Sequence, residues 1–292
     1  MKSLVIATDA AQSWHLTELR RAAESLGWRV SHCSLSELWF DTDRQPLVHF
    51  PEGVLAAGQE LPDLLWVRSI AAGSFEQITF RLGLLRAIGI LGVRVINSAR
   101  AIESCVDKSM TSFLLAERGI AQPPSRTSED QTIASNWGEE SLIAKPLFGA
   151  MGKGLRQFTP PELPPESEFD HGVWYIQKLV RTPPQSPTPV FYDYRLLVAG
   201  DRCIAAMRRE SDHWITNYAQ GGSCHPYEPS RREAELAIAA AKAVGADYAG
   251  VDIIHNQNHE PLIIEVNSMP AWQGLQSVTN YNIAETLLAK IL

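Results

Sequence analysis

Several features that define large classes of proteins are missing from this chain of 292 residues. No apolar run approaches the roughly 18 residues that a membrane-spanning helix needs. The chain passes from Met1-Lys2-Ser3 directly into a short apolar strand, without the segments of a signal peptide. Its four cysteines show no CxxC spacing, and so few cysteines do not form a disulfide scaffold. We therefore expect a cytoplasmic protein with free thiols and no membrane partner.

The sequence also lacks two glycine-rich nucleotide motifs. No GxGxxG follows the first expected strand, which argues against a dinucleotide domain, and no Gly-Lys-Ser/Thr occurs, which excludes a Walker A loop. The net charge of −7 argues against a surface that coats nucleic acid, although it allows a local basic cleft. With 45% hydrophobic and 20% charged residues, the composition is that of an ordinary globular protein.

Residues 1–97 are expected to form a small α/β domain. Short apolar strands at 4–8, 29–33, 64–67 and 93–96 alternate with helical patterns. This alternation is typical of a parallel sheet that is covered by helices.

The rest of the chain is expected to form two further parts. Residues 98–181 combine short helices with strands that flank a glycine-rich loop, which predicts a flexible flap. Residues 182–189 contain four prolines and predict a stiff connection or a loop beside a cleft. Residues 182–292 have the pattern of an antiparallel sheet with helices, an α+β arrangement.

Capping signals mark several helix starts. Ser74 and Ser230 are each followed three residues later by Gln or Glu, and Asn282 precedes the last helix. Ser128 and Gln131 are expected to open one more helix within residues 98–181.

The most informative stretch runs from 248 to 276, where two apolar strands are joined by a polar turn. Because side chains alternate along a strand, Ile263, Glu265 and Asn267 are expected on one face. Asp252 lies on the preceding strand, which the turn can bring alongside. Three oxygen ligands without His or Cys suit Mg²⁺ better than Zn²⁺. Alternatively, Asp252 caps the turn and Glu265 pairs with an arginine.

Two lysines lie at positions that suit phosphate binding. Lys108 is at the start of an expected helix, and Lys145 is at the end of an expected strand. A loop with three glycines in six positions, 149–154, follows Lys145. Lysine provides a compact cation, and glycines let backbone N–H groups approach phosphates closely. Two solvated surface lysines are the alternative.

Three arginines lie on an expected hairpin at 191–209: Arg195, Arg208 and Arg209. Asp193 shares a strand face with Arg195, so an ion pair between them is one interpretation. The other is binding of carboxylates or phosphates, to which the guanidinium fork is suited. Arg208 and Arg209 point to opposite faces of a regular strand, and the periodicity leaves open which of them faces the site.

Taken in order, these segments resemble the ATP-grasp ligases of the RimK-like group, and the resemblance extends from about Arg68 to the end of the chain. The segments are Asp-Lys at 107–108, Lys-Pro at 145–146 with Gly-Ala-Met-Gly-Lys-Gly after it, Ile-Gln at 176–177, Asp-Tyr-Arg at 193–195, Ala-Ala-Met-Arg-Arg at 205–209, Trp-Ile-Thr-Asn at 214–217, Gly-Val-Asp at 250–252 and Glu-Val-Asn-Ser-Met-Pro at 265–270.

Within that group, the segments at 67–77 and 97–109 look like the glutamate ligases associated with tetrahydromethanopterin-type cofactors. His-Trp-Ile-Thr-Asn at 213–217 also resembles the aminoadipate-carrier ligases of lysine biosynthesis. Their amino-acid-binding sequence after Glu-Val-Asn is not matched at 268–273, so this alternative ranks second. Many relatives have Glu where this chain has Lys178.

The resemblance implies an ATP-grasp fold with an N-terminal parallel α/β domain at 1–97, a small central lid at 98–181 and a C-terminal antiparallel-sheet domain at 182–292. It also implies roles for individual residues. ATP would contact Lys108, Lys145, Gly149, Met151, Gly152, Lys153, Gly154, Gln177, Lys178, Leu179 and Val180; Mg²⁺ (or Mn²⁺), as two ions, would contact Asp252, Glu265 and Asn267; the acyl phosphate or the substrates would contact Arg195, Arg208 or Arg209, Asn217, Arg68, Ser69 and Ser268.

The implied reaction is ATP-dependent amide formation. A carboxylate attacks the γ-phosphate of ATP to give ADP and an acyl phosphate, which an incoming amine converts to an amide. We expect a small acidic acceptor, L-glutamate as the amino acid and a homo-oligomer, either dimer or tetramer. A non-catalytic ATP-binding regulator is disfavoured by the complete set of metal ligands, and a nucleic-acid partner is disfavoured by the net charge.

Overall fold

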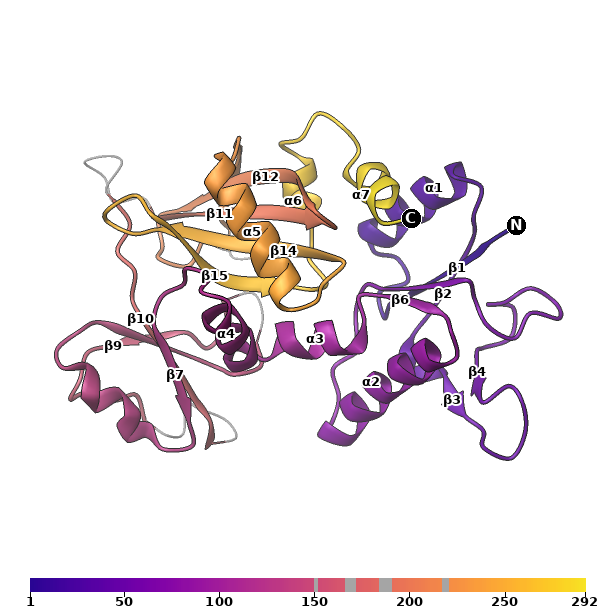
Figure 1. The fold of residues 1–292 in the computed structure, drawn as a ribbon, viewed down its shortest axis with the longest axis horizontal. Coiled ribbons are helices and arrows are strands. Elements are labelled where there is room, and N and C mark those ends of the chain that lie inside the picture. The colour runs from indigo at the N-terminus through magenta and orange to yellow at the C-terminus, as the bar shows by residue number, and fades with distance from the viewer. Residues whose placement is uncertain (150–151, 166–171, 184–190, 217–220) are drawn as a thin grey trace.

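The computed structural model contains three main sheets in the residues that it describes, which are 1–149, 152–165, 172–183, 191–216 and 221–292 (Figure 1). The first is a parallel sheet, as predicted. Its strands, in spatial order, are β2 (Arg29–Cys33), β1 (Ser3–Ala7), β5 (Leu64–Val67) and β6 (Arg94–Ile96).

Alternation along β1 explains how this sheet is covered on both faces. Leu4 and Ile6 pack against helix α1 (Trp14–Ser25), whereas Val5 and Ala7 pack against helix α2 (Phe75–Ile90). The expected capping box of α2 is formed, since Ser74 and Gln77 each accept from the other's backbone N–H. The connection between β2 and β5 holds η1 (Leu35–Glu37), β3 (Trp39–Phe40) and β4 (Val48–His49).

The second sheet is antiparallel and follows helices α3 (Ala99–Val106) and α4 (Lys108–Glu117). The prediction of a helix opened by Ser128 was wrong. Ser128 ends strand β7, which pairs with β10, and Asp130 instead caps the short 3-10 helix η2 (Gln131–Trp137). Residues 125–128 form a strand because they pair with β10, which is distant in the sequence. The strands in spatial order are β7 (Ser125–Ser128), β10 (Trp174–Lys178), β8 (Leu142–Lys145) and β9 (Arg156–Phe158).

The third sheet is also antiparallel, and helix α5 (Arg231–Ala243) covers one of its faces. Its edge strand β13 was not predicted from the sequence. The strands in spatial order are β13 (Ser223–Pro226), β12 (Arg202–Ser211), β11 (Phe191–Ala199), β14 (Tyr248–His255) and β15 (Pro261–Asn267).

A β-bulge corrects the expected alternation along β15. Asp252 pairs with Glu265, but the next pair joins Ile253 to Ile263, so Ile264 is an extra residue. Ile263 therefore faces the core beneath α5 rather than sharing a face with Glu265. The extra residue shifts the side-chain phase by one, which a strict two-residue period does not anticipate.

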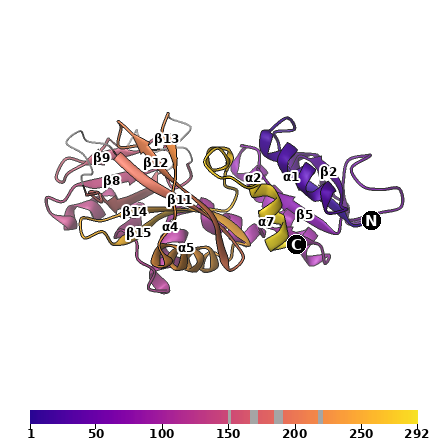
Figure 2. The same ribbon diagram turned by 90° about the horizontal axis from the view of Figure 1, so that it is seen from above.

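The C-terminal helices complete the N-terminal sheet. After α6 (Gln273–Gln276), helix α7 (Ile283–Ile291) returns to lie beside α1 (Figure 2), and Leu287 and Leu288 enter the same core as Leu4 and Ile6. No helix in the described part of the chain has the length and apolar character needed to cross a membrane.

Asn97 joins the end of β6 to the third sheet. Its side chain is fully buried, and Nδ2 donates to Tyr248 O at 2.8 Å and to Ser268 O at 2.6 Å. Oδ1 accepts from the backbone N–H groups of Asp247 at 2.6 Å and Tyr248 at 3.3 Å. One amide thus satisfies four backbone groups.

We expect Asn97→Ala to lower the free energy of unfolding by about 3 kcal/mol or more, because it leaves several buried polar groups unpaired. Chemical denaturation measures this loss. Asn256→Ala is the matched control, since Asn256 makes comparable hydrogen bonds in an exposed turn. Equal losses in the two variants would contradict the role of Asn97.

Candidate active site

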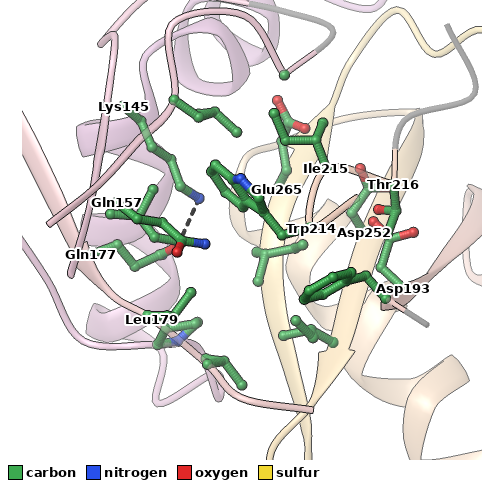
Figure 3. Close-up of a pocket in the computed structure, with 18 of the residues that line it drawn as sticks. Lys145, Gln157, Gln177, Leu179, Asp193, Trp214, Ile215, Thr216, Asp252 and Glu265 are labelled. Atoms are coloured by element: carbon green, nitrogen blue, oxygen red, sulfur yellow. Dashed lines mark hydrogen bonds between the residues drawn. The ribbon is translucent and has the colours of Figure 1, made fainter. Parts of the chain in front are cut away.

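A cavity of about 480 Å³ lies between the second and third sheets (Figure 3). Its size is typical of small-molecule sites. Ile143, Ile254 and Ile264 form an apolar part of its wall, and charged side chains from both sheets also line it. Of the residues predicted from the sequence, the cavity is lined by Lys108, Lys145, Gly149, Gly152, Lys153, Gln177, Lys178, Leu179, Val180, Arg209, Asp252 and Glu265.

The two lysines are half-buried, and neither has a carboxylate partner among the described residues. Lys145 Nζ donates to Gln177 Oε1 at 2.7 Å, and Lys108 Nζ donates to the carbonyl oxygens of Gly149 at 3.0 Å and Leu147 at 3.4 Å. Burial, followed by the charge of Lys108, lowers the pKa of Lys145 to about 8, against the opposing effect of Glu265. Burial also lowers the pKa of Lys108. Two partly desolvated cations that lack carboxylate partners fit a polyanionic ligand such as a polyphosphate.

The loop that follows Lys145 needs glycine at its end. Gly154 has φ +72°, and a Cβ there would lie 2.7 Å from Cγ of Pro146. Gly154 therefore packs against Pro146 instead of lining the cavity. Met151, which the sequence also assigned to this loop, lies outside the described residues.

Residues at the end of β10 present backbone to the cavity. The N–H of Lys178 donates to Pro124 O at 2.9 Å, and the N–H of Leu179 donates to Ser141 O at 3.0 Å. Lys178 Nζ lies 2.6 Å from Glu140 Oε1 in an ion pair. Lys178 therefore does not add an unpaired positive charge beside the cavity.

An alternating series of charges crosses three neighbouring strands of the third sheet. Arg195 Nε and Nη2 each donate at 2.7 Å to the Asp252 carboxylate, and Arg209 Nε donates at 2.7 Å to Asp193. Arg209 also lies 3.0 Å from Asp252. The ion pairs thus run between strands, and the pair considered from the sequence, Asp193 with Arg195 along one strand, is not formed.

These ion pairs set the ionisation of the buried acid. Burial opposes ionisation of Asp252, but the charges of Arg195 and Arg209 outweigh it and hold the pKa below its usual range. Burial likewise opposes the charge of Arg209, and Asp193 and Asp252 nevertheless raise its pKa. Asp252 and Arg209 are therefore both charged at neutral pH.

Arg209, not Arg208, faces the cavity. Arg209 is 2% exposed and lines the site. Arg208 lies over the ring of Tyr192 at 4.6 Å and pairs with Glu210 at 2.7 Å. The structure therefore settles the choice that strand periodicity left open.

The oxygen donors near the cavity fit Mg²⁺ in kind. Asp252 and Glu265 are opposite each other in the sheet, and no ion pair joins Glu265 to another described residue. Asn267 does not line the cavity; its Nδ2 donates to Gly250 O at 3.5 Å. Within the described ranges, no three His, Cys, Asp or Glu side chains form a metal cluster by themselves. An ion here would also need Asn267 or ligand oxygens.

The residues assigned to the acceptor lie outside the cavity, at the junction with the N-terminal sheet. Arg68 Nη1 donates to Pro270 O at 3.0 Å, and its guanidinium lies 4.8 Å from the ring of Trp272. Ser69 Oγ is 3.2 Å from Thr8 Oγ1, and Ser268 is buried. Asn217 lies outside the described residues.

The sequence reasoning missed several residues that line the cavity or support it. Trp214 begins the Trp-Ile-Thr-Asn segment, but the sequence predicted no role for it, and Gln157 on β9 was not predicted as a site residue. Tyr175 shares the face of β10 with Gln177, which alternation could have revealed. Asp193 was considered only as an ion-pair partner.

The comparisons with known proteins agree with this geometry. A family model described as a RimK-like ATP-grasp domain matches residues 176–291. The tetrahydromethanopterin:α-L-glutamate ligase of Methanococcus maripaludis is 37% identical over 208 residues, which cover 68% of this chain and 70% of that protein. The ligase of the same name from Methanosarcina acetivorans is 28% identical over 330 residues, covering 99% and 98%.

Among solved structures, the ATP-grasp ligase PsnB in complex with a variant of its minimal precursor, Mg and ADP has a TM-score of 0.73. It is 19% identical in sequence and covers 100% of this chain and 97% of that one. This likeness establishes the fold. The fold and the relatives together define an ATP-grasp ligase.

The chain belongs to the RimK-like ATP-grasp family. The resemblance noted in the sequence, the fold class and the enzyme class are thereby confirmed.

We expect nucleotide affinity to fall as pH rises through about 8, because Lys145 loses its charge there. Calorimetric titration with ATP between pH 7 and pH 10 measures this dependence. Lys145→Arg is the matched control, since arginine stays protonated throughout and should flatten the profile. An equally steep decline in both proteins would assign the pH dependence to another group.

Proposed function

We propose that the protein is an ATP-dependent carboxylate–amine ligase that adds L-glutamate to a small acidic acceptor through an acyl phosphate. One observation carries the proposal. Two lysines, one at the start of α4 and one at the end of β8 in the second sheet, line the same cavity as Asp252 and Glu265 on the third, in a chain whose relatives are named tetrahydromethanopterin:α-L-glutamate ligases. A pterin-type acceptor is accordingly the first candidate, and peptides are the second.

Different parts of the cleft suit the phosphates and the base of ATP. Lys108 and Lys145 would hold phosphate oxygens, with the loop from Gly149 to Gly154, including Met151, Gly152 and Lys153, packed over them. The apolar walls at Ile143 and Ile254 suit the base. Its polar edge would meet backbone groups of Gln177, Lys178, Leu179 and Val180 other than the N–H groups of Lys178 and Leu179, which already donate to Pro124 O and Ser141 O. Buried cations stabilise the phosphates more strongly than exposed ones, since they are screened less by water.

The metal would be Mg²⁺, with Mn²⁺ as a substitute and two ions as the proposed number. Asp252, Glu265 and Asn267 would hold it, each through oxygen. When bound, Mg²⁺ neutralises charge on the phosphates. Asp252 would have to weaken one of its arginine contacts, because both of its oxygens accept from Arg195.

The arginines would bind the negative groups of the reacting carboxylate. Arg209 lines the cavity and pairs with Asp193, whereas Arg195 does not line the cavity and pairs with Asp252 beside it. An acyl phosphate carries the negative charge that guanidinium forks bind. Asn217 and Ser268 are proposed to contact the substrates nearby. Arg208, which lies over Tyr192, is proposed to act only by supporting β12.

The acceptor would lie between the N-terminal sheet and the segment that follows β15. Arg68 and Ser69 follow the carboxyl end of β5, the edge at which ligands bind in open parallel sheets. Arg68 already fixes Pro270. We therefore infer that residues 268–273 contribute to acceptor selectivity. The aminoadipate-carrier alternative is not favoured, since the relatives are named glutamate ligases.

Incubation with ATP, Mg²⁺, glutamate and a panel of pterin, peptide and carrier-protein acceptors tests the reaction. We expect ADP release with an acidic acceptor, and mass spectrometry should find products heavier by whole glutamyl residues. Glu265→Gln should lower the rate by about 100-fold or more, as losses of charge-stabilising groups do. Glu260→Gln, in the exposed turn before β15, is the control. Nucleotide binding without turnover on any acceptor would favour the regulator.

Self-association is a separate part of the proposal. The inner face of α2 is buried through Leu84 and Leu85, yet Phe75 and Ile90 on its outer face are 82% and 84% exposed. A second copy of the chain could cover this face by an antiparallel α2 pair, which would bring Phe75 of each copy toward Ile90 of the other.

Phe75→Asp should therefore reduce the molecular mass measured by light scattering to that of the monomer. Leu26→Asp, at another exposed apolar side chain, should leave the mass of the assembly unchanged. A wild-type protein that is already monomeric would refute the proposed oligomer.

A further inference from the structure

A buried chain of hydrogen bonds leads from helix α4 to Lys145. Ser112 Oγ lies 2.8 Å from Tyr175 Oη, Gln177 Nε2 donates to Tyr175 Oη at 3.1 Å, and Lys145 Nζ donates to Gln177 Oε1 at 2.7 Å. Figure 3 shows the last of these contacts at the wall of the cavity. Tyr175 is 2% exposed and Gln177 is 3% exposed. Neither has a role in the function proposed above beyond the backbone of Gln177.

The direction of two of these hydrogen bonds follows from chemistry. A lysine ammonium only donates, so the amide atom that faces it must be Oε1. The NH₂ group of Gln177 then points to Tyr175, whose hydroxyl accepts from it, while either hydroxyl can donate in the contact between Tyr175 and Ser112. Removal of the hydroxyl would leave a buried NH₂ donor without this acceptor. Rotation of the amide by half a turn would then point that NH₂ at the lysine ammonium.

The chain also connects the two lysines of the cleft. Ser112 follows Lys108 by one helical turn, so both lie on the same side of α4. Lys145 lies at the end of β8, which pairs with β10, where Tyr175 is directly opposite Lys145. The hydrogen bonds thus link the helix that carries one lysine to the strands that position the other.

We propose that Tyr175 is a positioning residue for the nucleotide, which orients the amide of Gln177 so that its oxygen holds the side chain of Lys145 toward the phosphates. This inference rests on the proposed function, because it requires Lys145 to contact phosphate. Tyr175 does not line the cavity. It acts through Gln177, and Ser112 acts through Tyr175.

Tyr175→Phe tests the inference, because phenylalanine keeps the buried ring and removes only the hydroxyl. We expect the dissociation constants of ATP and ADP to rise on the order of tenfold, which is typical for loss of one buried hydrogen bond. The affinity for adenosine, which lacks phosphates, should not change. The KM for ATP should rise, while the KM values for glutamate and the acceptor stay the same.

Two further variants separate positioning from packing. In a Gln177→Leu background, adding Tyr175→Phe should cost no further nucleotide affinity, since the hydroxyl acts only through Gln177. Tyr227→Phe is the matched control. Its hydroxyl is bonded to buried Glu233 outside the cleft, so this variant should leave nucleotide affinity unchanged.

Each outcome decides between the alternatives. Equal losses of affinity for ATP and adenosine in Tyr175→Phe would mean that the hydroxyl supports the cavity as a whole, and unchanged ATP affinity would also overturn the inference. If Tyr175→Phe does not fold, Ser112→Ala at the far end of the chain should give the same phosphate-selective loss. A wild-type protein that binds no ATP would overturn the proposed function, and this inference with it.

Discussion

The organising constraint in this structure is that a buried charge needs a partner. On the third sheet the protein itself supplies the partners. Arg209 on β12 contacts Asp193 on β11 and Asp252 on β14. Arg195 on β11 also contacts Asp252, so each cation contacts a carboxylate. Opposite this sheet, among the described residues, Lys145 at the end of β8 donates to an amide oxygen and Lys108 at the start of α4 donates to backbone carbonyls, and neither forms an ion pair with a carboxylate. Partial dipoles offset less of the cost of burial than full charges do. The cleft therefore carries excess positive charge on one side, which a bound polyphosphate would balance.

That cleft depends on contacts that cross the three parts of the chain. The N-terminal sheet is covered by the C-terminal helix α7, and Asn97 bonds backbone groups at the start of β14 and after β15. The segment after β15, in turn, is held by Arg68 and by His15, whose Nε2 accepts from the Trp272 N–H at 2.9 Å. Burial and the charge of Arg68 lower the pKa of His15 to about 4, so this acceptor is uncharged at neutral pH. These contacts therefore hold the first and third sheets together beside residues 268–273.

Most secondary structure could be predicted because its signals are local. The strands at 29–33 and 64–67 and the capping boxes at Ser74 and Ser230 agree with the structure, since hydrophobic period and cap chemistry act within a few residues. Strand β7 and edge strand β13 were missed, because their residues are polar and are ordered by pairing with β10 and β12. The bulge at Ile264 was missed for a related reason: only the pairing of β15 with β14 reveals an extra residue.

The sequence by itself determined the chemical inventory of the site, namely oxygen donors at Asp252 and Glu265, lysines at 108 and 145, glycines after Lys145 and arginines on a hairpin, in an order that identifies the family. The tertiary structure decided which of them meet. It selected Arg209 over Arg208, paired Arg195 with Asp252 instead of Asp193, and neutralised Lys178 with Glu140. It also placed Arg68 and Ser69 at the domain junction rather than in the cavity. Residue type and period are properties of the chain, whereas the choice of partner depends on strand register and on contacts between residues that are distant in sequence.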